Sequence, residues 1–421
     1  MSTALKIEDF DDPTFNPFAT VDRMQGFEDI DDPYPRFHAL HRKGTVLKGD
    51  VRREFGLQQL PVWANYPSWM VLGYDAVYRA FSDGAVLSNS VKQRFYDISF
   101  GKSIDGMDGA EHVRYRRLFQ KAFLPQNVAR WGKELVPGVV NALIDKFSAR
   151  GHAELVSEFT ELFPFHVIYG QLALPVKDLA VFHRLAVGLI CAGVDQVHSL
   201  EAQRKMGDYF TLRLQERRAE LDGGAPEGDD LITMLALAEV DGERLPNEIT
   251  VSLLRQLMAA AGDTTFRVTG SLLAGLLTHP EQLDAVRRDR ALVPKAIEEA
   301  LRWEAPLPFE QRFAEQDVVL DGVTIPAGSY VDVVIGSANR DPGRFENPDE
   351  FDIFRKPDRH MTFAYGPHIC LGQHLARLEM THAIGAILDR LPNLRMDPDK
   401  PAPRVSGLNS RSPKAVHVVF D

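Results

Sequence analysis

The sequence predicts a mainly α protein with a minor antiparallel β part. Helical periodicity dominates from Glu111 onward, while short strand-like runs occur in the first hundred residues and again after Glu315. With 421 residues, of which 44% are hydrophobic, the chain can bury a large core. No linker rich in Gly, Ser or Pro divides the chain and no repeat is present, so we expect a single domain over residues 1–421.

The first predicted elements are short. Residues 68–73 form a short strand-like run, and residues 74–81 follow as a short helical stretch. From Glu111 onward helices prevail, interrupted by turn signals such as Leu174-Pro175. The polar, Gly-rich stretch 222–230 is short and is expected to be a surface loop within the domain.

The longest predicted helix begins near Asn247, which can cap it, and ends at His279-Pro280. Its apolar residues Ile249, Leu253 and Leu257 recur at helical spacing. A helix of roughly thirty residues is about 45 Å long, enough to cross the domain.

Three strands are predicted after Glu315, over residues 318–320, 323–325 and 330–334. The segment 326–329, Pro-Ala-Gly-Ser, forms the turn before the last of them. These strands supply most of the minor β part.

Composition excludes several classes of partner. The net charge of −11 argues against nucleic acid and anionic membrane surfaces, because both attract basic patches. The only cysteines, Cys191 and Cys370, lie far apart and suggest no disulfide framework. The N-terminus has no basic, apolar leader and no stretch is long enough to span a membrane, so we expect a cytoplasmic protein.

The segment Phe363-Ala-Tyr-Gly-Pro-His-Ile-Cys370-Leu-Gly372 carries the most specific pattern of the chain. Cys370 stands between a glycine-bearing loop and a helix start, where backbone N–H groups and the helix dipole favour a thiolate. Such a sulfur can hold haem iron. The alternative is a buried free cysteine beside a helix cap.

A second pattern, Ala260-Ala-Gly-Asp263-Thr264-Thr, lies inside the long helix. Gly and Thr are poor helix-interior residues, so we expect a local opening that leaves the Thr264 hydroxyl free for water or dioxygen. An acid beside an alcohol suits proton delivery. A simple packing kink is the alternative.

Charged pairs mark two further helices. Glu299 and Arg302 are three residues apart, a spacing usual for a surface ion pair. His112 and Arg116 are four apart on one face of another helix, where basic residues are ordinarily solvated.

Together these motifs resemble the cytochrome P-450 superfamily, the haem-thiolate monooxygenases, of the soluble bacterial type, and the resemblance covers most of the chain. It implies the P-450 fold, a single triangular domain. It implies heme b, iron protoporphyrin IX, with Cys370 as the metal ligand. It also implies a structural clamp in which Arg355 joins Glu299 and Arg302. The residues implied to bind the cofactor are His112, Arg116, Arg312, His368, Cys370, Phe363 and Gly372.

The resemblance implies catalytic roles for Asp263 and Thr264, which would manage protons. Two positions depart from the family pattern: Ala261 stands where glycine is usual, and Ala364 where glycine or a small polar residue is usual. Ala261 would narrow the oxygen groove, and Ala364 would alter the turn beside the sulfur.

The implied substrate pocket is mostly apolar, which indicates a nonpolar small organic molecule. Lys92 and Arg94 offer recognition of a carboxylate, or they belong to a solvated loop. The expected lining residues are Phe95, Tyr96, Ile98, Phe100, Ile104, Met258, Ala259, Leu307, Pro308 and Phe309.

The implied reaction is hydroxylation or O-dealkylation with dioxygen. No dinucleotide fingerprint follows a strand and no reductase is fused, so electrons are expected from a separate ferredoxin or flavodoxin with an NAD(P)H-dependent reductase. Arg114, Arg117 and Lys121 share a helix face that suits an acidic carrier, or they are simply solvated. The alternatives are a peroxide-driven peroxygenase, a non-enzymatic haem sensor, and a haem-thiolate isomerase or dehydratase.

Overall fold

The computed structural model describes residues 5–26, 30–84, 87–240 and 242–421, and it confirms a mainly α architecture. The helices of these described residues are α1 Pro17–Gln25, α2 Tyr34–His41, α3 Val51–Glu54, α4 Tyr74–Ser82, α5 Ser90–Ser99, α6 Gly109–Ala122, α7 Pro125–Glu134, α8 Val136–Ile144, α9 Phe163–Gln171, α10 Leu179–Ile190, α11 Gln196–Asp222, α12 Leu231–Ala236, α13 Asn247–Thr278, α14 Pro280–Arg288, α15 Val293–Trp303, α16 Ile335–Asn339 and α17 Gln373–Arg390.

The strands are short. They are β1 Val46–Lys48, β2 Ser68–Val71, β3 Leu87–Ser88, β4 His152–Glu154, β5 Glu239–Val240, β6 Glu243–Arg244, β7 Glu310–Ala314, β8 Val318–Leu320, β9 Val323–Ile325, β10 Ser329–Val333, β11 Arg395–Met396, β12 Val405–Ser406, β13 Ser412–Pro413 and β14 His417–Val419. The predicted strands and the helix after residue 73 are thus confirmed, with ends shifted by a residue or two.

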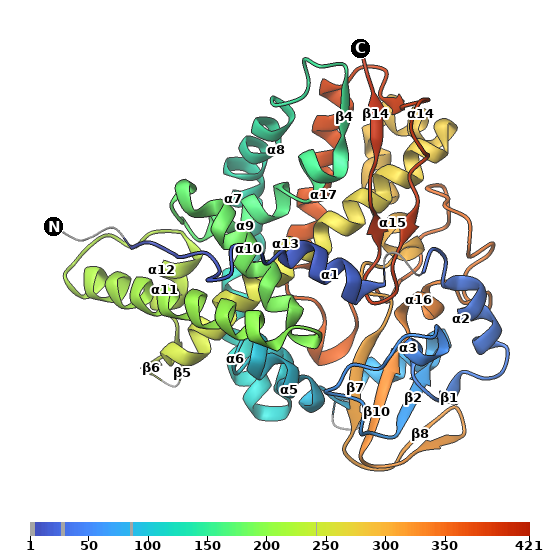
Figure 1. The fold of residues 1–421 in the computed structure, drawn as a ribbon, viewed down its shortest axis with the longest axis horizontal. Coiled ribbons are helices and arrows are strands. Elements are labelled where there is room, and N and C mark those ends of the chain that lie inside the picture. The colour runs from blue at the N-terminus through green and yellow to red at the C-terminus, as the bar shows by residue number, and fades with distance from the viewer. Residues whose placement is uncertain (1–4, 27–29, 85–86, 241) are drawn as a thin grey trace.

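The main sheet of the described chain has the strand order β1-β2-β10-β7-β3. Its pairs are antiparallel except β10 with β2, where Val331 lies opposite Trp69 in parallel register. In Figure 1 this sheet lies at the lower right and helices fill the left and upper parts, which gives a roughly triangular outline.

Helix α13 runs through the centre of the helical part and connects two apolar clusters. Its first half packs with α10 and α11, where Phe182 and Phe210 are fully buried. Its second half packs with α9, α15 and α17, where Leu272 and Ile384 are buried. The predicted range is confirmed, but the predicted cap is wrong: Pro246 precedes the helix, and the Asn247 side chain accepts a hydrogen bond from Arg218 instead.

Helix α17 follows the Cys370 loop directly and packs against α7, α8 and α15. The Glu299 carboxylate on α15 binds Arg302 with both oxygens, at 2.7 and 2.8 Å, and accepts from Arg355 at 3.2 Å. Arg302 also donates to the carbonyls of Asn339, Pro348 and Glu350, so the clamp ties α15 to the segment leading to the cysteine.

None of the helices within the described residues combines the length and apolarity needed to cross a membrane.

Candidate active site

Backbone hydrogen bonds close the Cys370 loop. Cys370 N donates to Phe363 O at 2.9 Å, and Ile369 N donates to Gly366 O at 3.1 Å. Gly366 has φ of +72°, and a Cβ there would lie 2.5 Å from the carbonyl oxygen of Phe81. Only glycine therefore fits this turn.

Ala364 has φ of +55°, a left-handed conformation that an L side chain adopts at a cost of about 1 kcal/mol. The predicted effect of this departure on the local turn stays a prediction. The neighbouring ring of Phe363 lies 4.4 Å from the Arg377 guanidinium, which fixes the start of the loop against α17.

The Cys370 sulfur faces a cavity rather than the core of the protein, and Gly372 N–H donates to it. Burial raises the pKa of the Cys370 thiol. The hydrogen bond from Gly372 and the charges of Arg116 and Arg377 lower this pKa, but by less than burial raises it. The thiolate expected at Cys370 therefore stays a prediction. A bound metal cation ionises such a thiol.

The cavity beside Cys370 has a volume of about 240 Å³ and lies between the loop, α6 and α13. On the α13 side it is bounded by Ala260, Ala261 and Thr264. It brings most of the predicted cofactor residues together. They are His112, Arg116, Phe363, His368, Cys370 and Gly372.

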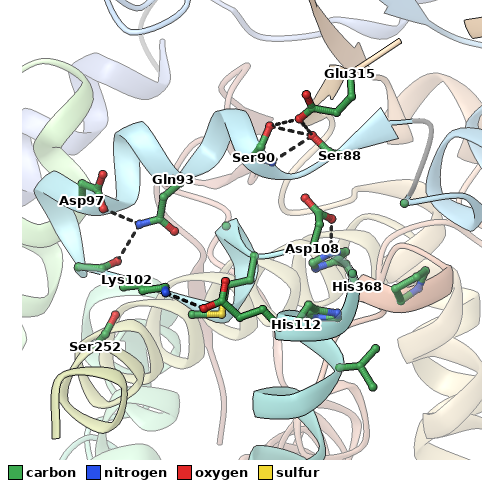
Figure 2. Close-up of a pocket in the computed structure, with 18 of the residues that line it drawn as sticks. Ser88, Ser90, Gln93, Asp97, Lys102, Asp108, His112, Ser252, Glu315 and His368 are labelled. Carbon is green, nitrogen blue, oxygen red and sulfur yellow. Dashed lines mark hydrogen bonds and ion pairs between the residues drawn. The ribbon is translucent and has the colours of Figure 1, made fainter. Parts of the chain in front are cut away.

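Nitrogen donors gather at one edge of this cavity. The rings of His112 and His368 stack with centroids 4.0 Å apart, and His368 Nε2 lies 3.2 Å from Asp108 Oδ1 (Figure 2). Both histidines also line a larger cleft of about 1220 Å³, which Figure 2 shows. Burial and the charges of His368 and Arg116 lower the pKa of His112 to about 4, so this ring is neutral at pH 7.

The other two residues predicted to bind the haem carboxylates, Arg116 and Arg312, differ in position. Arg116 lines the cavity and donates to the carbonyl of Ile369, beside the cysteine. Arg312 on β7 is 3% exposed and stacks on Phe81, but it does not line this cavity. Within the described chain its guanidinium makes one hydrogen bond, to Gln311 O at 2.8 Å, which leaves donors for another acceptor.

The residues present fit a haem. His112 Nε2 is buried without a hydrogen-bond partner in the described chain, an expensive state unless an acceptor is supplied. A Cβ added to Gly372 would meet no atom within 4 Å, so open space lies above the residue next to the sulfur. Both features are expected where a porphyrin and its carboxylates bind.

Asp263 and Thr264, the two residues predicted to handle protons, are not arranged as expected. Helix α13 continues without interruption past Gly262, and the Thr264 hydroxyl donates to Ala260 O at 3.1 Å. The predicted opening and free hydroxyl are therefore wrong for this state. Asp263 does not line the Cys370 cavity; Arg267 holds its carboxylate with two hydrogen bonds, at 2.7 and 3.0 Å.

A second cavity of about 280 Å³ meets the first along α13, since Ala260 and Thr264 line both. Of the predicted pocket residues, Phe95, Tyr96, Phe100, Ala259, Leu307 and Phe309 line it. Ile104 lines the Cys370 cavity instead, and Met258 lines a smaller cavity on α13. Ile98 and Pro308 line none of these three cavities. The side chain of Arg94 lies outside the described part of the structure.

Sequence reasoning missed several members of this second cavity. Leu60 and Trp63 come from a segment without helical or strand periodicity, so no pattern pointed to them. Asp105, Glu310 and Lys92 also line it, and the wall is more polar than the aromatic pattern suggested. Lys92 is 6% exposed, so it is not part of a solvated loop.

A haem would need one residue to bind its iron and hydrogen-bond donors for its two carboxylates. Cys370 on one side and the histidines with Arg116 at the edge meet both needs, and the fold and site thus define a haem-thiolate protein.

Comparison with known proteins gives the family. The family model described as Cytochrome P450 matches residues 190–414. Cytochrome P450 107B1 of Saccharopolyspora erythraea is 31% identical over 82% of this chain and 87% of its own length. The cytochrome P450 monooxygenase PikC of Streptomyces venezuelae is 30% identical over 90% of each chain. The structure of CYP109Q5 from Chondromyces apiculatus superposes with a TM-score of 0.80, at 30% identity, over 93% of this chain and 95% of that one.

The chain belongs to the cytochrome P450 family. It is a P450 monooxygenase whose cofactor is haem, iron protoporphyrin IX. Members of the family act on small molecules and receive electrons from redox partners.

Proposed function

We propose that this enzyme, folded as one domain over residues 1–421, hydroxylates or O-dealkylates a small organic molecule with a largely apolar body. The observation that carries the proposal is the meeting of the two cavities at Thr264, one bounded by Cys370 and the other by aromatic side chains. A substrate in the second cavity is therefore next to the space above the sulfur.

Haem, when bound, supplies the activation of dioxygen. Cys370 is the residue that binds the iron, with Phe363 and Gly372 shaping the space around it. The haem carboxylates are assigned to four residues: His112, Arg116, Arg312 and His368. His112 would act as a neutral donor through its Nε2, which has no partner among the described residues.

Proton handling is assigned to Thr264 and Asp263. The Thr264 hydroxyl now donates to Ala260 O, and rotation about one bond would turn it toward the cavity. Asp263 would have to leave Arg267 to reach the same space. The working state of the relay thus requires side-chain motion on α13.

The proposed electron donor is an acidic ferredoxin or flavodoxin, reduced by an NAD(P)H-dependent reductase. Arg114, Arg117 and Lys121 are exposed on α6, and Arg116 of that helix contacts the carbonyl next to Cys370. A carrier on this face would dock close to the sulfur, and its rate of association would fall with added salt.

Reconstitution tests the proposal. The haem-loaded protein is mixed with ferredoxin, reductase and NADH, and candidate substrates are screened by the shift of the Soret band that they cause. We expect product in proportion to NADH consumed. Faster turnover with hydrogen peroxide than with the electron chain would support a peroxygenase, and no substrate-dependent NADH use with any Soret-active compound would support a haem sensor.

A further inference from the structure

A charged cluster is built into the wall of the second cavity. Lys92 Nζ of α5 lies 2.5 Å from Glu310 Oε2 of β7 and 3.3 Å from Asp105 Oδ2, in the turn η1 Ile104–Gly106. The Tyr96 hydroxyl donates to the same Asp105 oxygen at 2.6 Å. All four residues line the cavity.

Negative charge is in excess in this cluster. Lys92 faces two carboxylates, those of Asp105 and Glu310. Arg312, whose charge interacts with Glu310 and Asp105, and Asp108 add one charge of each sign, and His368 Nδ1 lies 3.9 Å from Asp105 Oδ1.

Within this cluster, one carboxylate oxygen of Glu310 can still accept a hydrogen bond. Glu310 Oε2 receives Lys92, whereas its Oε1 has no hydrogen-bond partner among the described residues. The Glu310 side chain is 20% exposed and that of Lys92 only 7%, so the carboxylate is the more accessible of the pair. A substrate carboxylate would find the ammonium of Lys92 already shared between two anions.

The rest of the wall is mixed: besides aromatic and aliphatic side chains it includes Gln256, Gln311 and Asn409, and Asp263, whose carboxylate is bound by Arg267. Trp63, Phe95 and Phe309 line the same cavity, and Thr264 lies on the α13 side. A ligand held at Glu310 can therefore lay an apolar body along the aromatic side chains toward Thr264.

We propose that the substrate carries a protonated amine, which Glu310 binds through its free carboxylate oxygen. This inference rests on the proposed function, because it assigns the second cavity to the substrate. A buried charge-assisted hydrogen bond of this kind typically strengthens binding by about tenfold or more relative to a neutral group.

The test is a ligand series on one hydrocarbon skeleton, bound to the full haem-loaded chain and followed by calorimetry. The probes are N,N-dimethyldecylamine, decanol and decanoate. A tertiary amine is used because it is a poor iron ligand, and the Soret band reports any direct ligation. We expect the amine to bind at least about tenfold more tightly than decanol and decanoate.

Glu310→Gln should remove the preference for the amine and leave decanol affinity unchanged. Glu315→Gln, an exposed glutamate beyond the end of the same strand, should keep the preference and serves as the matched control. Equal affinities for amine and decanol in the parent, tighter binding of decanoate, or an amine preference that survives Glu310→Gln would each overturn the proposal.

The parent series needs no variant, so a poorly folded Glu310→Gln protein does not block the test. Failure of the proposed function is a separate result: an amine preference without product in the reconstituted system would leave the recognition intact and reject the oxidation.

Discussion

Asp263 and Arg267, one turn apart on α13, form a two-pronged ion pair in which Oδ1 accepts from Nη2 at 2.7 Å and Oδ2 from Nε at 3.0 Å. The Arg267 side chain is 3% exposed and also donates to Ser412 Oγ. The acid assigned to proton delivery is therefore held by Arg267, and it lines the second cavity rather than the Cys370 cavity.

Breaking this pair should be costly. Arg267→Met leaves Asp263 charged and partly buried without its partner, and we expect the free energy of unfolding to fall by about 3 kcal/mol. The double variant with Asp263→Asn should recover part of that loss, because no unpaired charge remains. Urea unfolding of the four proteins in the cycle measures the coupling, and additive losses would show that the pair contributes nothing.

Thr264→Ala should uncouple electron use from product formation. Haem content and substrate affinity should stay as in the parent, while product per NADH falls about tenfold or more and hydrogen peroxide accounts for the missing electrons. Thr278→Ala is the matched control, since its hydroxyl makes the same type of backbone bond, to Ala274 O at 2.7 Å, at the far end of α13. Unchanged product per NADH in Thr264→Ala would remove this residue from the relay.

Ala364→Gly should stabilise the protein. Glycine relieves the left-handed strain at φ +55° but loses more chain entropy on folding, so the expected net gain is about 0.5–1 kcal/mol. Ala285→Gly, inside α14, should have the opposite sign because helical glycine is unfavourable. Thermal unfolding distinguishes the two, and a loss of stability in Ala364→Gly would mean that the alanine methyl group packs usefully.

Asp332 should make stability pH-dependent. Burial raises the pKa of this carboxyl to about 7. The hydrogen bonds that it accepts from Tyr330 OH at 2.6 Å and Val51 N at 2.9 Å act in the opposite direction and lower the pKa by less. Between about pH 4 and 7 the folded state keeps a proton that the unfolded state has lost, so stability falls as pH rises through this window and then levels off.

Asp332→Asn removes that titration. Its stability relative to the parent should grow by roughly 3 kcal/mol between pH 4 and 7 and stay constant above. Denaturant unfolding at several pH values is the measurement, with Asp399→Asn at an exposed site as control. A parallel pH profile in Asp332→Asn and the parent would show that Asp332 is ionised in the folded protein.

The fold and the cofactor end of the site could be predicted from the sequence because their signals are local. Strand and helix periodicity marked β2, β8 and α13, and the spacing of Phe363, Gly366 and Cys370 marked the loop. Glu299 and Arg302 share a helix turn, so their contact also follows from spacing.

The rest depends on contacts between distant segments or on choices between local partners. Lys92 and Glu310 are brought together only by the tertiary fold: the sequence offered Lys92 as a carboxylate-binding residue and gave no signal for Glu310. The sequence alone did not decide whether Asp263 acts together with Thr264 beside it or pairs with Arg267 one turn later. In the structure Asp263 pairs with Arg267, because the buried guanidinium donates two charged hydrogen bonds to its carboxylate.

The most direct test of the account is the absorption spectrum of the reduced, carbonyl-bound protein loaded with haem. We predict the strongly red-shifted Soret band of thiolate-ligated iron in the parent and in Cys191→Ala, because the buried Cys191 does not line the Cys370 cavity. Cys370→Ala should lose that band entirely. A red-shifted band that persists in Cys370→Ala would contradict the assignment of Cys370 as the iron ligand.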